Sequence, residues 1–123
     1  MATGKADVDT TALLGGKQLR VFGRAPWPET KVAQEAMWAP MVASLQEICE
    51  YARPFGIQIA IQNHNRSSFC MYSWQILRMI EEVDRENFGH IMDTGMSMST
   101  PVGSIYSIYH SCSALFHRPA HCG

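Results

Sequence analysis

Charged residues are scarce in this sequence, and long apolar runs are missing. Asp, Glu, Lys and Arg together make up 17% of the 123 residues, and the net charge is −1 with neutral histidines. Because this balance implies no strongly basic face, we expect no nucleic-acid partner. A membrane-spanning helix needs about 18 or more consecutive apolar residues. No such run occurs, so we expect no membrane partner either.

Signals for export and for disulfides are also missing. Residues 1–16 carry one lysine and no apolar run of signal-peptide length, which argues against a leader or an anchor. The four cysteines form no Cys-x2-Cys pair and show no even spacing. We therefore predict reduced thiols in a cytoplasmic protein. These cysteines are Cys49, Cys70, Cys112 and Cys122.

Three short apolar runs have the character of β-strands. Residues 19–22, 57–61 and 88–92 are rich in β-branched or aromatic side chains and are bounded by glycine or polar residues. Helical patterns separate them, so the order is strand, helix, strand, helix, strand. This alternation predicts an α/β fold with parallel strands and right-handed helical crossovers.

Two segments have apolar residues at helical spacing, about 31–53 and about 74–84. Ser73 is the expected N-cap of the second helix. Pro40 lies inside the first, where it should kink the helix or start a second one. Residues 1–17 form a polar N-terminal segment, in which a frayed or short helical piece precedes a turn at Gly15–Gly16.

Polar side chains follow each predicted strand at its carboxyl end. In parallel α/β folds this edge of the sheet gathers the functional groups. Imidazole, amide and carboxylate groups together suit a divalent metal and a polyhydroxylated substrate. The candidates are Arg24, Gln62, Asn63, His64 and Asp93.

Each candidate also has a structural explanation. Asp93 precedes Thr-Gly and could brace a turn. His64 could be a buried structural histidine, and Gln62 and Asn63 could hold neighbouring loops through hydrogen bonds. A loop arginine such as Arg24 is most often a solvated cation.

The final segment, 101–123, is expected to be an irregular tail. Its histidines and cysteines have no spacing typical of a zinc finger, so we do not predict structural zinc there. The residues concerned are His110, Cys112, His117, His121 and Cys122.

Three segments together resemble the xylose isomerase-like TIM barrel superfamily. Residues 56–64 read as glycine, an apolar strand and Gln-Asn-His, where the family usually has Glu-Asn-His. Residues 87–95 resemble its next strand, which ends in Asp-Thr-Gly. Residues 14–23 resemble the preceding strand, with the form Leu-Gly … Arg-Val-Phe-Gly.

The resemblance implies a divalent metal (Mn2+, Mg2+, Co2+ or Zn2+) at the carboxyl mouth of the barrel. Asp93 matches a ligand aspartate, and Gln62 stands where the family has a ligand glutamate. An amide oxygen can ligate a hard cation but brings no charge, which weakens metal binding. We assign His64 as a catalytic residue, and Asn63 and Arg24 as substrate-binding residues.

The fold implied is a partial (β/α)8 TIM barrel of about three parallel strands, because a whole barrel needs about 250 residues. We divide the chain into residues 1–17, a partial barrel at 18–100 and the tail at 101–123. A truncated gene or a shifted reading frame is one hypothesis for the length. Unpaired strand edges favour homo-oligomers or aggregation.

The expected function is that of a sugar phosphate isomerase or epimerase, with metal-assisted proton transfer on a small sugar or polyol. We expect this stretch alone to be inactive. The alternative is a non-catalytic relative that binds a carbohydrate or a protein and has lost metal ligands. Endonuclease IV-like repair is disfavoured, since its several His and carboxylate ligands and basic groove are missing.

Overall fold

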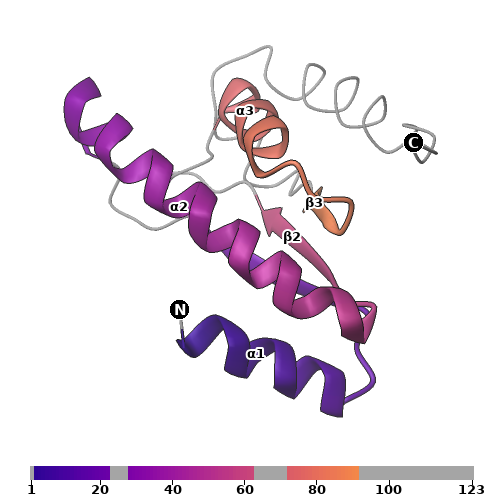
Figure 1. The fold of residues 1–123 in the computed structure, drawn as a ribbon. Coiled ribbons are helices and arrows are strands. Elements are labelled where there is room, and N and C mark those ends of the chain that lie inside the picture. Colours follow the sequence, from indigo (N-terminus) through magenta and orange to yellow (C-terminus); the bar gives the residue numbers. More distant parts are fainter. Residues whose placement is uncertain (1, 23–27, 63–71, 92–123) are drawn as a thin grey trace.

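The computed structural model describes residues 2–22, 28–62 and 72–91. Candidates Arg24, Asn63, His64 and Asp93 lie outside these residues, as does the tail. The element order is α1 (Ala2–Leu13), β1 (Gln18–Phe22), α2 (Lys31–Ala52), a 3-10 turn (Arg53–Phe55), β2 (Gln58–Gln62), α3 (Ser73–Val83) and β3 (Phe88–Ile91) (Figure 1).

The three strands form one parallel sheet in the order β1-β2-β3. Val21 lies beside Ile61, which lies beside His90. One residue further on, Phe22, Gln62 and Ile91 are in register, so all three strands end at one edge. The predicted α/β class and the three parallel strands joined by helices are therefore confirmed.

The two faces of the sheet have different surroundings, because successive strand residues point to opposite sides. Ile59, Ile61 and Phe88 point to the face that packs with α2 and α3, and they belong to the main core. In Figure 1, α2 crosses in front of this sheet. The helices contribute Leu45, Ile48, Cys49, Ala52, Ile76, Met79 and Val83 to the same core.

The opposite face carries Arg20, Ala60 and Gln62, by the same alternation. This face corresponds to the interior of a closed barrel, which helices do not cover. A buried amide and a guanidinium are thus placed on the side away from the main core.

Helix α2 is continuous through Pro40, so a second helix does not begin there. Thr30 is its N-cap, and the Thr30 hydroxyl accepts a hydrogen bond from the Ala33 amide at 3.3 Å. Pro40 is exposed. The carbonyl that its missing N–H leaves without a helical partner is therefore next to water, which reduces the cost of the proline. A kink at Pro40 stays a prediction.

Helix α3 begins one residue earlier than predicted, and its N-cap is Tyr72, not Ser73. The Tyr72 amide donates to Oε1 of Gln75 at 3.0 Å. The capping oxygen thus belongs to Gln75 in the first turn of the helix, and it accepts from the amide of the preceding N-cap residue, as in a capping box. The helix ends at Val83, and its C-cap, Asp84, has a left-handed backbone (φ 46°, ψ 55°).

The N-terminal segment forms a full helix, α1, which packs on α2. Val8 is completely buried. The Tyr51 hydroxyl donates to Asp9 at 2.7 Å, and Lys5 forms a 2.6 Å ion pair with Glu47. The predicted turn follows at Gly15, where φ is +75°. The division into segments 1–17, 18–100 and 101–123 stays a prediction.

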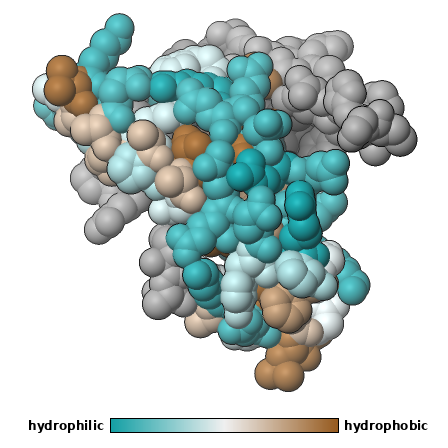
Figure 2. All heavy atoms as spheres, in the orientation of Figure 1, coloured by the Kyte–Doolittle hydropathy of each residue, from teal (hydrophilic) through white to brown (hydrophobic). Residues whose placement is uncertain are grey.

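The outer surface of the helix layer is mainly hydrophilic, as Figure 2 shows. Among the residues that the structure describes, the exposed large apolar side chains are Leu13, Leu14, Val32, Phe55 and Trp74. Among the described helices, none combines the length and apolar character needed to cross a bilayer.

Candidate functional site

Gln62 is the predicted site residue that the structure describes. It is the last residue of β2, not the first residue of the following loop, and its side chain is only 9% exposed. Its neighbours in register are Phe22 on β1 and Ile91 on β3. Gln62 therefore lies at the carboxyl edge of the central strand, where a parallel α/β fold places its chemistry.

Arg20 contacts this residue from the neighbouring strand. Its Nη1 donates to Oε1 of Gln62 at 3.1 Å. Arg20 is level with Ala60, two residues before Gln62 on β2. The guanidinium therefore extends toward the carboxyl edge, past Ala60, whose side chain is only a methyl group.

Arg20 was missed as a site residue in the sequence. The available signal was a charged residue inside an otherwise apolar strand, Leu19-Arg20-Val21-Phe22. Arg20 is exposed, but its guanidinium can reach a polar side chain on the neighbouring strand. The partner is 42 positions away, and only the strand register identifies it.

The Gln62 oxygen has the chemical type that a hard divalent cation accepts, but its surroundings oppose a cation. Calcium and magnesium take neutral amide oxygens together with carboxylates. Here the oxygen already accepts a hydrogen bond from a guanidinium. Within residues 2–22, 28–62 and 72–91, no group of three His, Cys, Asp or Glu side chains could hold a metal. Gln62 alone is therefore a weak cation ligand.

His90 is buried on the other face of the sheet. It is level with Ile61, so the alternation directs it toward the helix layer and away from the face of Gln62. Burial lowers the pKa of its imidazole to about 4. His90 is thus neutral at physiological pH and is structurally separate from the candidate site.

Cys49 lies on α2 and is buried in the main hydrophobic core. Burial raises the pKa of its thiol to about 12. Because the thiolate is the reactive form, this cysteine is chemically inert in the folded chain. It is a free thiol, as predicted.

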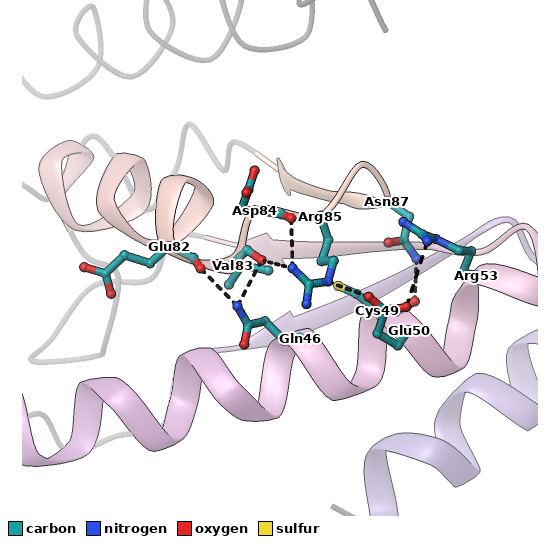
Figure 3. Close-up of polar contacts among 9 residues, drawn as sticks. All are labelled: Gln46, Cys49, Glu50, Arg53, Glu82, Val83, Asp84, Arg85 and Asn87. Carbon is teal, nitrogen blue, oxygen red and sulfur yellow. Dashed lines mark hydrogen bonds and ion pairs between the residues drawn. The ribbon is translucent and has the colours of Figure 1, made fainter. Parts of the chain in front are cut away.

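A group of polar contacts at the amino end of the sheet fixes the position of β3 (Figure 3). Nδ2 of Asn87 donates to the carbonyls of Cys49 at 2.8 Å and Ile57 at 3.2 Å. The Asn87 carbonyl accepts from the Ile59 amide at 2.7 Å. Asn87 therefore joins α2, β2 and β3, and it helps to set the register that brings Ile91 beside Gln62.

Two further side chains attach the end of α3 to α2 (Figure 3). Nε2 of Gln46 donates to the carbonyls of Glu82 and Val83 at 3.2 and 3.3 Å. Arg85 donates to Glu50 at 2.6 Å and to two carbonyls at the end of α3. These bonds satisfy carbonyls that a helix end leaves without an internal partner.

The chain resembles solved structures of epimerases and related barrels. A D-allulose 3-epimerase from Methylomonas sp. is 26% identical with a TM-score of 0.70, and the match covers 86% of this chain and 40% of the epimerase. The IOLI protein, solved with a bound zinc atom, is 23% identical with a TM-score of 0.68, over 84% of this chain and 37% of that protein.

A third structure is a xylose isomerase-like TIM barrel protein from Mycobacterium smegmatis in complex with magnesium. It is 16% identical with a TM-score of 0.72, and the match covers 90% of this chain and 40% of that protein. At identities of 23% and 16%, the likeness to these last two proteins shows the fold alone. This chain spans 37–40% of the length of the three proteins.

No curated protein matches the sequence. The family model described as "Xylose isomerase-like TIM barrel" matches residues 2–102, which is most of the chain. The sheet described above, with three parallel strands joined by helices, is the corresponding part of such a barrel. The chain belongs to the xylose isomerase-like TIM barrel family.

Proposed function

We propose that this chain is part of a sugar isomerase or epimerase that transfers a proton on a small sugar or polyol. Family membership and the likeness to a D-allulose 3-epimerase support this reaction class. The substrate is proposed only as a small polyhydroxylated sugar, either phosphorylated or free. Cytoplasmic location and homo-oligomers through the strand edges stay predictions.

The observation that carries the proposal is the position of Gln62 at the carboxyl edge of β2. Its neighbour in register is Ile91, and Asp93 follows Ile91 by two residues in the sequence. Of the two positions that the family resemblance assigns to metal ligands, Gln62 thus ends β2, and Asp93 follows in the sequence the end of the adjacent parallel strand, β3. We propose Gln62 and Asp93 as ligands of a divalent metal at this edge.

The proposed roles of the other candidates follow from their chemistry. His64 would take or return the proton, because its unperturbed pKa lies near neutral pH. Asn63 and Arg24 would orient substrate hydroxyl, carbonyl or phosphate oxygens by donating hydrogen bonds. A divalent metal, when bound, would polarise the oxygens next to the carbon that loses its proton.

Metal binding is the direct test. We expect titration of the full chain with Mn2+ in a calorimeter to show saturable heat, and Asp93→Ala to weaken the affinity by at least about 100-fold. A ligand carboxylate contributes several kcal/mol to the binding of a hard cation. Asp7→Ala is the matched control, because Asp7 is exposed on α1 and should leave the titration unchanged. Equal affinities of the two variants would contradict the assignment of Asp93.

Proton transfer has its own readout. An epimerase exchanges the proton at the carbon next to the carbonyl with solvent, so a full-length protein that contains this stretch should remove the C3 proton signal of D-allulose in D2O from NMR spectra. His64→Gln should remove this exchange without changing Mn2+ affinity. Exchange at the wild-type rate in His64→Gln would refute the catalytic role of His64.

The second candidate function is a non-catalytic relative that binds a carbohydrate or a protein. The hydrogen bond between Arg20 and Gln62 favours this alternative, because it places a positive charge beside a neutral side chain at the proposed metal site. Such a protein would give no Mn2+ heat and no proton exchange. Heat from a sugar without heat from Mn2+ would support this alternative.

A further inference from the structure

Arg20 and Gln62 form a pair across two strands on the face of the sheet away from the main core. Nη1 of Arg20 is 3.1 Å from Oε1 of Gln62. Gln62 is largely buried, with 9% of its surface exposed, and the adjacent Ala60 is 2% exposed. The Gln62 amide therefore lies in a restricted space with few alternative orientations, whereas Arg20 reaches it from an exposed position on β1.

The chemistry of the two groups determines which end of the amide faces Arg20. A guanidinium has five N–H donors and no acceptor, whereas an amide has one oxygen acceptor and one NH2 donor. Only the oxygen can therefore face Arg20. This orientation follows from the chemistry of the two groups alone.

The same oxygen is the one atom of the Gln62 side chain that can ligate a cation. Ligation would place a divalent ion next to an oxygen that already accepts a bond from a positive charge. The Arg20 guanidinium and the cation are both positive. In a partly buried setting, their repulsion should change the affinity for the cation severalfold or more. Arg20 thus competes with a metal at position 62, electrostatically and for the oxygen.

We infer that Arg20 is a positioning residue: it holds the Gln62 oxygen toward β1 and lowers the affinity of the carboxyl edge for a divalent cation. The inference rests on the proposed function, because it takes this edge to be where the cation binds. It assigns to Arg20 control over how strongly metal occupies the site. Relieving the repulsion should therefore tighten metal binding, although a polar contact is lost.

The test compares Mn2+ titrations of the wild-type full chain, Arg20→Met, Gln62→Glu and the double variant. We expect Arg20→Met to bind Mn2+ about tenfold more tightly, because one positive charge is removed beside the ligand. Gln62→Glu should also tighten binding, since it adds a carboxylate. In the double variant both effects should combine, with non-additivity that measures the coupling between the two side chains.

Two control variants separate the effect of the position of the Arg20 charge from the effect of the net charge of the chain. Arg53→Met removes the same charge just before β2, at the opposite end of this strand, and Arg53 is exposed. Its Mn2+ affinity should stay within about twofold of wild type, because distant surface charges are screened. Arg20→Lys keeps the charge but loses the planar fork. It should keep the wild-type affinity while the side-chain amide 15N resonance of Gln62 shifts.

The outcomes distinguish this inference from the proposed function. If Mn2+ binds and Arg20→Met matches Arg53→Met in affinity, the inference is wrong and the metal site stands. If Mn2+ binds to none of the proteins, Gln62→Glu included, the proposed metal site is wrong and the inference falls with it. Should Arg20→Met fail to fold, Arg20→Gln replaces it, because this variant removes the charge and keeps a donor for Gln62.

Discussion

The guanidinium of Arg78 lies over the indole ring of Trp38, with Cζ 4.2 Å from the ring centroid. The same guanidinium makes two bonds to Glu35, at 2.7 and 2.9 Å, and one to Glu82 at 2.7 Å. Nε1 of Trp38 donates to Glu82 at 2.5 Å. Four side chains thus connect α2 with α3, from the buried Trp38 outward to the exposed Glu35.

Arg78→Met should lower the free energy of unfolding by about 1 kcal/mol, because the methionine retains apolar contact with Trp38 but loses the cation and its bonds. Urea unfolding in low salt measures the change. Arg53→Met is the control, since Arg53 is 4.0 Å from Glu50 and is more exposed. An Arg78→Met change no larger than that of Arg53→Met would contradict a stabilising role for the stacked guanidinium.

Stability should fall as the pH is lowered from about 6.5 to about 4, because of His90. Burial lowers the pKa of His90 from 6.5 to about 4 in the folded chain. The unfolded state therefore binds more protons in this window, and the linkage favours unfolding there by up to about 3 kcal/mol. Above pH 6.5 the contribution is constant.

Comparing wild type with His90→Gln measures this effect, since glutamine does not titrate in this range. Unfolding free energies at several pH values between 4 and 7 should show a shallower slope for the variant. Identical slopes would mean that His90 is not the titrating group.

Cys49 should resist alkylation in the folded chain, because its thiol is buried and its pKa is raised to about 12. Iodoacetamide treatment at pH 8, followed by peptide mass spectrometry, should leave Cys49 unmodified under native conditions and modify it in urea. Similar labelling rates in both conditions would show that α2 opens readily.

Asn87→Ala should destabilise the chain by about 1–3 kcal/mol. The Cys49 and Ile57 carbonyls both accept from Asn87. The Cys49 carbonyl also accepts from the Arg53 amide, so the expected loss is that of two hydrogen bonds between elements, one of them to a carbonyl that keeps another donor. Gln58→Ala is the matched control, because Gln58 is an exposed residue at the same end of the sheet. Equal losses in the two variants, measured by urea unfolding, would argue against the bridging role.

The sequence was sufficient for the elements whose signal is local. Ile57 to Ile61 is a β-branched run between a glycine and polar residues, and it became β2 with a shift of one residue. The N-cap of α3 was misplaced because the capping group is the Gln75 side chain, which acts backwards on Tyr72. The preference for serine at N-cap positions does not reveal a bond from the Tyr72 amide to the Gln75 side chain.

The candidate site was predictable only in part, for a geometric reason. Strand ends could be located from the sequence, so the position of Gln62 at the carboxyl end of β2 was predicted to within one residue. The contact with Arg20 depends on which residues of β1 and β2 are level, and the register follows from packing of whole strands. A lone arginine in an apolar strand carries no information about its partner 42 positions away.

The bridge that Asn87 forms at the start of β3 has a consequence at the other end of that strand. Side chains along a strand alternate between two faces, so sliding β3 by a single residue against β2 would exchange those faces. The imidazole of His90 would then take the place of Ile91 beside Gln62, and Gly89, which has no side chain, would lie beside Ile61 on the helix side instead. The side-chain amide of Asn87, just before β3, thus helps to determine which side chain lies beside Gln62 at the other end of that strand.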